Sequence, residues 1–318
     1  MKIVVLDGFS VDQGELDWNE LRRLGDVTVY PRTLPHEITE RAAGAQAVLT
    51  NKVVLTREVI EALPDLRYVG IVATGTNVVD FDACRGSGIA ITNAPGYGAV
   101  AVAQFVFATL LQLLEDIGPY IAAVKANRWA EAPDYCFFLH PHTELADKSI
   151  AILGLGNIGK RVAEIARAFG MNVISVAVPG GSTDERTPLD VALGAADVVT
   201  LHCPLTDRTR RMVDEHFLGA MKPGAILINT SRGALVDEEA LLAALSHGRL
   251  GGALLDVLSE EPPPRDHPLL DPRAPWAKRV VVTPHIAWGK VEARRRLIRL
   301  VAANLAAFVS GERLNRVD

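Results

Sequence analysis

Short runs of β-branched and other apolar residues alternate with segments of helical spacing along the chain. Strands separated by helical segments pair in parallel, because each helix carries the chain back to the same edge of the sheet. The first third therefore predicts a parallel sheet with helices on both faces. Its expected strands are Ile3–Leu6, Val27–Tyr30, Ala47–Leu49, Tyr68–Val72 and Ala90–Thr92.

A turn and a long apolar segment interrupt this rhythm. Residues 94–98 (Ala-Pro-Gly-Tyr-Gly) favour a turn, since proline fixes φ and glycine permits positive φ. The apolar segment Ala99–Leu114 predicts a buried helix and marks the crossing into a second domain. Six strands follow, the number typical of a doubly wound dinucleotide-binding fold. They are expected at Ser149–Leu153, Asn172–Val178, Val198–His202, Ala225–Asn229, Gly252–Asp256 and Val280–Thr283.

The last part of the chain predicts a helix from Glu292 to Phe308 that returns to the first domain. The length of 318 residues agrees with two domains, because a single core rarely grows past ~250–300 residues. We expect an α/β fold with two doubly wound parallel sheets. Residues 1–98 and 290–318 would form a smaller flavodoxin-like domain, and residues 99–289 a Rossmann-type domain.

Composition excludes several classes of protein. The formal net charge is −5, so the basic excess of a nucleic-acid-binding protein is missing. No apolar run approaches the ~20 residues that cross a membrane, and the four apolar residues before Asp7 are too few for a signal-peptide core. Cys84, Cys136 and Cys203 are too scattered for a zinc site or a disulfide framework. We expect a cytoplasmic α/β enzyme without a metal.

A glycine-rich motif, Gly-Leu-Gly-Asn-Ile-Gly, lies between a predicted strand and a helix expected at Lys160–Phe169. In such a turn the first glycine permits a tight bend, the second lets pyrophosphate approach, and the third lets helix and strand pack closely. The N–H groups at the helix start then face the phosphates. The motif predicts a dinucleotide site. Its expected cofactor-binding residues are Gly154, Gly156, Asn157, Ile158 and Gly159.

The acidic residue that usually binds the ribose 2′-hydroxyl, ~20 residues further on, is missing. Ala177 stands near that position, and the first acids after it are Asp184 and Glu185. Loss of the carboxylate removes repulsion of a 2′-phosphate. Donors to such a phosphate are Ser182, Thr183 and Arg186, although Arg186 could equally be a solvated loop charge. NAD and NADP both stay open, with NADP slightly favoured.

Arg232, Glu261 and His285 each follow a different predicted strand of the second domain. In open parallel sheets the ligand crevice lies at the carboxyl ends of the strands. Three ionisable side chains at that edge indicate an active site. Three segments of the first domain accompany them: Leu49-Thr50-Asn51-Lys52, Ala73-Thr74-Gly75-Thr76-Asn77 and Thr92-Asn93-Ala94-Pro95-Gly96-Tyr97.

With these motifs the chain resembles, over essentially its whole length, the D-isomer-specific 2-hydroxyacid dehydrogenases, and within them the glycerate dehydrogenases or hydroxypyruvate reductases. Trp288 after His285 is typical of that branch. The resemblance implies hydride transfer between NAD(P)H and a short 2-keto acid, from hydroxypyruvate to D-glycerate or from glyoxylate to glycolate. It also implies a homodimer, to which the helix Ala99–Leu114 contributes, and a cleft between a substrate domain and a cofactor domain that closes on the substrate.

The resemblance implies a role for each ionisable residue. His285 would protonate the carbonyl oxygen, Glu261 would orient the imidazole and favour its charged form, and Arg232 would bind the substrate carboxylate. Glu260 is a rival for the acid, but the family motif places the acid directly before proline.

Further binding residues follow from the same resemblance. The expected cofactor contacts are His202, Cys203, Pro204, Thr230, Ser231, Asp256 and Ala287, with Cys203 as a wall residue rather than a nucleophile. The expected substrate contacts are Lys52, Ala73, Thr74, Gly75, Arg232 and Trp288. Two alternatives stay open: a phosphoglycerate dehydrogenase, and a nucleotide-sensing binding protein of the same fold with little turnover.

Overall fold

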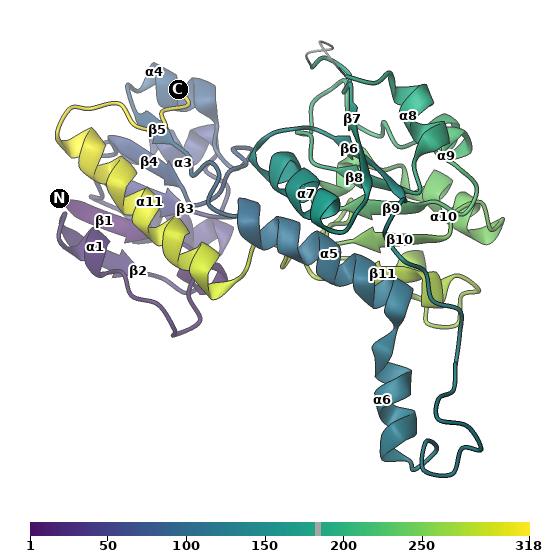
Figure 1. The fold of residues 1–318 in the computed structure, drawn as a ribbon. Helices are drawn as coiled ribbons and strands as arrows, with labels where there is room; N and C mark the ends of the chain where they lie inside the picture. The colour runs from purple at the N-terminus through teal and green to yellow at the C-terminus, as the bar shows by residue number, and fades with distance from the viewer. Residues whose placement is uncertain (182–185) are drawn as a thin grey trace. The chain divides into compact units, whose positions relative to one another are not determined.

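The computed structural model describes residues 1–181 and 186–318 (Figure 1). These residues form two compact units, Met1–Gly98 with Trp288–Asp318, and Ala99–Ala287. The second boundary lies two residues before the expected one, so Trp288 belongs to the first unit.

The first unit contains a five-stranded parallel sheet of order β2-β1-β3-β4-β5, the flavodoxin-like order. The order reverses between β1 and β3, which places the topological switch point of the sheet there. The strands are β1 (Lys2–Val5), β2 (Asp26–Val29), β3 (Ala47–Thr50), β4 (Tyr68–Ile71) and β5 (Ala90–Thr92).

Helices cover both faces of this sheet. One face packs against α11 (Val291–Val309), whose Leu297, Val301 and Leu305 are buried with Tyr68 of the sheet (yellow helix in Figure 1). On this face lies also α1 (Asn19–Arg22), and the opposite face carries α2 (Ile38–Ala42), α3 (Arg57–Glu61) and α4 (Phe81–Gly86).

The second unit contains a six-stranded parallel sheet of order β11-β10-β9-β8-β6-β7, a doubly wound arrangement whose order reverses between β6 and β8. Because all its strands are parallel, the loops that follow them meet at one edge. The strands are β6 (Ser149–Leu153), β7 (Asn172–Val176), β8 (Val198–Leu201), β9 (Ile226–Asn229), β10 (Gly252–Leu255) and β11 (Val280–Val282).

Two helical layers cover this second sheet. One layer is formed by α5 (Ala99–Glu115) and α7 (Asn157–Ala168), which bury Val106, Leu110 and Val162 against the sheet. The other layer contains α8 (Leu189–Ala195), α9 (Glu215–Ala220) and α10 (Glu238–Ser246). The predicted α/β class with two doubly wound parallel sheets is confirmed.

Six strands are shorter than expected, by one residue in β4, β8, β9, β10 and β11 and by two residues in β7. β7 ends at Val176 rather than Val178, because the chain leaves the sheet after Val176 bridges Thr187 and approaches the turn at Pro179. β8 ends at Leu201 rather than His202, although the backbone N–H of His202 still bonds to Leu153 (2.8 Å).

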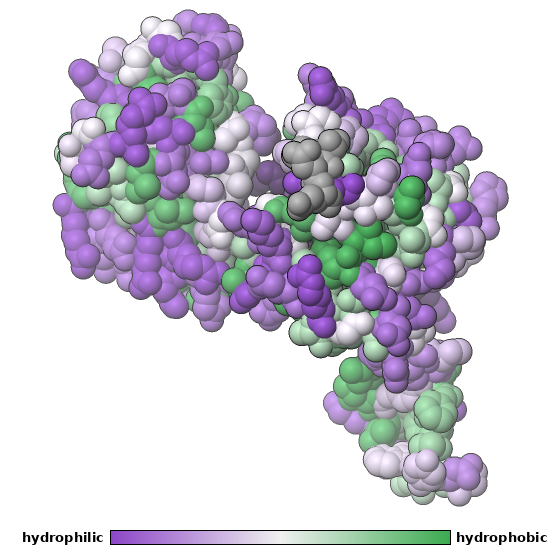
Figure 2. Space-filling view, turned by 45° about the horizontal axis from the view of Figure 1, so that its top comes forward, coloured by the Kyte–Doolittle hydropathy of each residue, from purple (hydrophilic) through white to green (hydrophobic). Residues whose placement is uncertain are grey.

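An arm extends from the second unit beyond α5. It begins with α6 (Ile117–Lys125) and continues as a loop to about residue 145, away from the sheet (Figure 1). Apolar side chains gather on its surface (Figure 2). Among the described residues no single helix has the length and composition to cross a membrane. Only α5 and α6 taken together have the required length and apolar composition, and the chain bends by 56° between these two helices.

Candidate active site

The glycine-rich turn after β6 has the geometry that the sequence motif predicts. Gly154 adopts φ +102°, and a Cβ there would lie 2.7 Å from the His202 carbonyl. A Cβ at Gly159 would lie 2.0 Å from the Gly154 carbonyl oxygen, whereas a Cβ at Gly156 would meet nothing within 4 Å. Two glycines therefore permit close backbone packing and the third leaves open space beside the start of α7, where Asn157 and Ile158 form the first turn.

A cavity of about 710 Å³ lies beside this turn. Gly154 and Gly156 line it together with His202, Cys203 and Pro204, so the structure brings five of the predicted cofactor residues together. Burial raises the pKa of the Cys203 thiol to about 11, so this residue is a neutral wall residue at neutral pH. Burial also lowers the pKa of His202 to about 3, which keeps its imidazole neutral.

Two polar atoms at this edge of the sheet lack partners. Within residues 1–181 and 186–318, the buried His202 Nδ1 and Thr230 Oγ1 make no hydrogen bond. Buried polar atoms normally have partners, so orphan atoms indicate a place where a ligand supplies them. A cofactor that carries phosphate, ribose and amide groups fits such a site. The neighbouring Ser231 hydroxyl, in contrast, donates to the Cys203 carbonyl (2.7 Å).

Two arginines, Arg186 and Arg208, line the cavity together with one acid, Asp207. No acid stands at Ala177, directly after β7. A Cβ on Gly180 would lie 3.0 Å from Arg208 Cδ, so the Arg208 side chain lies against this glycine turn. Arg208 was not predicted from the sequence, because it follows β8 and only the fold places it beside the turn after β7. The expected donors Ser182 and Thr183 and the acids Asp184 and Glu185 lie outside the described residues.

His285 and Glu261 form a pair at the same edge of the sheet. His285 Nδ1 lies 2.7 Å from Glu261 Oε2, and Glu261 Oε1 accepts a hydrogen bond from the backbone N–H of Leu258 (3.1 Å). Of the two neighbouring acids, Glu261 is therefore the one whose carboxylate orients the imidazole. A carboxylate at this distance holds the ring in one orientation.

Asp256 holds the loop that carries His285. Its carboxylate accepts hydrogen bonds from the Thr283 hydroxyl (2.6 Å) and from the backbone N–H groups of Ile286 (2.9 Å) and Ala287 (2.8 Å). Burial raises the pKa of Asp256, and these three donors oppose the rise. His285 itself has φ +55°, a left-handed conformation that a non-glycine residue keeps only when its surroundings enforce it. Asp256 and Ala287 thus contact each other and shape the loop around His285.

Arg232 lies in the loop after β9. The buried Asn229 fixes this loop, because its amide donates to the Arg232 carbonyl (2.8 Å) and its oxygen accepts from the Ser231 N–H (3.0 Å). A Cβ at Gly233 would lie 1.9 Å from the Leu258 carbonyl. The Arg232 loop therefore packs directly on the backbone that leads to Glu261. The sequence analysis missed Asn229, which read only as the last residue of a strand.

The predicted substrate residues of the first unit follow β3 and β4. Lys52 is exposed in the loop after β3. In the turn after β4, the Ala73 carbonyl accepts from the Ala94 N–H (2.9 Å) and the Thr74 hydroxyl donates to the Ala94 carbonyl (2.8 Å), while Gly75 stays partly exposed. Trp288 lies edge-on to Tyr97, with 6.1 Å between the ring centroids.

Comparisons with known proteins agree with this arrangement. Residues 107–287 match the family model "D-isomer specific 2-hydroxyacid dehydrogenase, NAD binding domain". The chain is 40% identical to a hydroxypyruvate reductase of Blautia hydrogenotrophica over the whole of both chains. It is 38% identical to a glycerate dehydrogenase of Methylorubrum extorquens, over 100% of this chain and 99% of the relative.

A solved structure matches the whole fold. It is the NADPH-dependent glyoxylate/hydroxypyruvate reductase of Sinorhizobium meliloti in complex with NADP and malonate, with a TM-score of 0.80 and 28% identity, over 99% of this chain and 96% of that one. The family match covers more than half of the 318 residues, and the relatives match from end to end. The chain belongs to the D-isomer specific 2-hydroxyacid dehydrogenase family.

Proposed function

We propose that the protein reduces a short 2-keto acid, hydroxypyruvate or glyoxylate, to the corresponding 2-hydroxy acid, D-glycerate or glycolate, with NAD(P)H. Family membership makes it an NAD(P)-dependent oxidoreductase. The observation that carries the proposal is the His285–Glu261 pair, 2.7 Å apart, at the same sheet edge as the glycine turn. The names of the end-to-end relatives support the choice of substrate.

Each residue supplies one part of the chemistry. A nicotinamide cofactor held beside the glycine turn would supply the hydride for the carbonyl carbon of the keto acid. His285 gives a proton to the carbonyl oxygen, and Glu261 keeps the imidazole oriented for that transfer. Arg232 binds the substrate carboxylate, since a planar guanidinium matches two carboxylate oxygens. Lys52, the turn 73–75 and Trp288 complete the contacts to the substrate.

The decisive experiment is oxidation of NAD(P)H in the presence of a panel of 2-keto acids. We expect turnover with hydroxypyruvate and glyoxylate, and weaker turnover with pyruvate. A preference for phosphohydroxypyruvate would favour a phosphoglycerate dehydrogenase instead. Cofactor binding with no turnover on any keto acid would favour a nucleotide-sensing protein. The names of the end-to-end relatives favour neither alternative.

For the cofactor we propose a preference for NADPH. Arg186 and Arg208 outnumber the one acid of the cavity, Asp207, and so supply the positive charge that a 2′-phosphate needs, while Ala177 supplies no carboxylate after β7. We expect Arg208→Ala to raise KM for NADPH about tenfold and to leave KM for NADH nearly unchanged, since one charged hydrogen bond is worth ~1.5 kcal/mol or more. The matched control is Arg210→Ala, an exposed arginine in the same segment. Equal effects on both cofactors would contradict the preference.

We also propose a homodimer in which the arm contacts the second copy. Large exposed apolar residues on an arm indicate an interaction surface. They are Ile117, Ile121, Val124, Trp129, Tyr135 and Phe138. Light scattering with size-exclusion chromatography should give twice the mass of 34.2 kDa, and a monomer would contradict the proposal. The cytoplasmic location stays a prediction from the sequence.

A further inference from the structure

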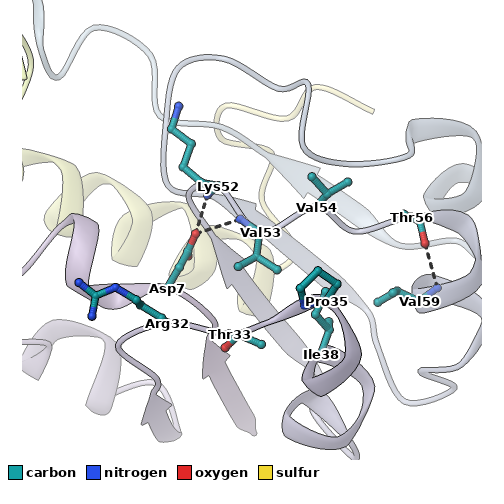
Figure 3. Close-up of a pocket in the computed structure, with 10 residues that line it drawn as sticks. All are labelled: Asp7, Arg32, Thr33, Pro35, Ile38, Lys52, Val53, Val54, Thr56 and Val59. Atoms are coloured by element: carbon teal, nitrogen blue, oxygen red, sulfur yellow. Dashed lines mark hydrogen bonds between the residues drawn. The ribbon is translucent and has the colours of Figure 1, made fainter. Parts of the chain in front are cut away.

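Asp7 follows the first strand of the first unit and is buried, with 8% of its surface exposed. Its carboxylate faces the loop after β3. Oδ1 accepts a hydrogen bond from the backbone N–H of Asn51 (2.8 Å), and Oδ2 accepts from those of Lys52 (2.5 Å) and Val53 (3.0 Å). Figure 3 shows the carboxylate directly below this loop, with two of the bonds drawn. One side chain thus fixes three consecutive backbone groups.

Topology explains why Asp7 reaches this loop. β1 and β3 are neighbours in the sheet, and their carboxyl ends lie on either side of the switch point. Three converging N–H groups form a concave site for an anion and compensate the charge of a buried carboxylate. The N–H groups stabilise the buried carboxylate, and the carboxylate in turn fixes the backbone of the loop. Side chain and loop therefore keep one arrangement.

Packing supports this loop on one side, where Val53 lies against the core of the first unit. A surface pocket of about 650 Å³ lies against it, lined among others by Pro35, Ile38, Val53 and Val54. Val54 is 51% exposed. In Figure 3 the Lys52 side chain points away from the apolar residues of the pocket. Because the pocket borders the loop on its other side, the hydrogen bonds to Asp7, together with the one from the Thr50 hydroxyl to the Val53 carbonyl (2.7 Å), fix the backbone that carries Lys52.

The same loop connects to the second substrate segment of this unit. The Asn51 amide donates to the Val72 carbonyl (2.5 Å), directly before the turn 73–75. That turn is fixed on its other side by Ala94, through Ala73 and Thr74. A continuous chain of hydrogen bonds therefore runs from Asp7 through Asn51 to the turn after β4.

We propose that Asp7 is a positioning residue for substrate binding. Its carboxylate fixes the loop 51–53 so that Lys52 stands in one arrangement with the turn 73–75 and receives the carboxylate of the 2-keto acid. Asp7 acts through these residues and touches neither substrate nor cofactor. The inference rests on the proposed function, because it takes Lys52 as a substrate contact.

The test begins with Asp7→Asn, which keeps the shape of the side chain but replaces one acceptor oxygen with an amide donor. We expect KM for hydroxypyruvate to rise about tenfold, kcat to change less than about threefold, and Kd for NADPH to stay unchanged, the pattern of lost substrate binding. Asp12→Asn is the matched control. Asp12 accepts two backbone hydrogen bonds from Gly14 (2.8 Å) and Leu16 (3.0 Å) in the same unit, and its loss should leave KM unchanged.

A double-mutant cycle with Lys52→Met separates positioning from general damage. If Asp7 acts through Lys52, the effect of Asp7→Asn on KM should fall below about twofold in the Lys52→Met background. The inference would be overturned if the two substitutions raised KM independently, so that their effects multiplied in the double variant. It would also be overturned if Lys52→Met left KM unchanged. If Asp7→Asn does not fold, Asp7→Glu keeps the charge and shifts it by one methylene, and the same cycle applies. The proposed function is judged separately, by turnover of the wild-type enzyme on the keto-acid panel.

Discussion

Each unit uses a buried aspartate at a strand end to hold the loop that follows a neighbouring strand. Asp7 after β1 holds the loop after β3, and Asp256 after β10 holds the loop after β11. Both carboxylates accept three hydrogen bonds. The difference lies in what each loop carries: Lys52 in one, His285 in the other. Parallel sheets thus offer the same construction for the proposed substrate-binding residue and for the proposed proton donor.

The surroundings of the two carboxylates also differ. One donor to Asp256 is the Thr283 hydroxyl, and the loop that Asp256 holds keeps His285 at positive φ. Asp7 binds only backbone N–H groups, and its loop borders an open pocket. We expect changes at the Asp256 loop to act on kcat, because they displace the proton donor, and changes at the Asp7 loop to act on KM.

The largest expected effect comes from removal of the proton donor itself. His285→Gln should lower kcat by about 10²- to 10⁴-fold, the usual contribution of a positioned acid or base. Kd for NADPH, measured by fluorescence titration, should stay the same, since the cofactor cavity is formed by other loops. If the variant kept most of its turnover, His285 in the loop after β11 would not be the proton donor.

Asp256→Asn comes next. The one amide oxygen can still accept from the Thr283 hydroxyl and the Ile286 N–H, which share Oδ1, but the NH2 group then faces the Ala287 N–H as a second donor. The His285 loop should therefore shift, and kcat should fall about 10- to 100-fold with a smaller change in KM. Steady-state kinetics on hydroxypyruvate provide both values. Thr283→Val removes a single donor and should give a smaller loss in the same direction. A rise in KM without a fall in kcat would mean that Asp256 acts on substrate binding, as proposed for Asp7, and would contradict the expected difference between the two loops.

The smallest expected effect concerns stability against acid in the second unit. Burial lowers the pKa of His202 from its ordinary value of 6.5 to about 3, so the folded protein keeps this imidazole neutral while the unfolded chain protonates it. Stability from this residue is complete above pH 6.5 and is lost as the pH falls towards 3. At pH 5 the loss amounts to about 2 kcal/mol.

Thermal unfolding of His202→Gln at pH 5 and pH 7.5 tests this expectation. The variant should lose less stability than the wild type between the two pH values, whereas His247→Gln, at an exposed position, should behave like the wild type. If all three proteins lost the same stability, burial of His202 would not explain the acid response.

The fold was predictable because its signals are local. Apolar runs of strand length, the glycine turn at residues 154–159 and the break at residues 94–98 each report on their own segment. The loops that follow strands could be located in the same way, and this identified Arg232, Glu261 and His285 as candidate site residues.

The supporting residues could not be predicted, because their roles depend on which strands are neighbours. Asp7 read only as the acid that ends an apolar run, and its function appears once β1 and β3 lie side by side. Arg208 lies in the loop after β8, and only the folded chain places it against Gly180 beyond β7. The order of parallel strands is a global property, so residues that act across it carry no local mark.

The helix α11 has a consequence for biosynthesis. Its side chains Leu297, Val301 and Leu305 belong to the same core as Ile3 and Tyr68. The second unit is synthesised after Tyr68 and before α11. Because domains fold as they leave the ribosome, the nucleotide-binding half can mature while the flavodoxin-like half still exposes one bare face of its sheet. A ribosome stalled before residue 291 would therefore present a nascent chain with one finished half and one that depends on chaperones.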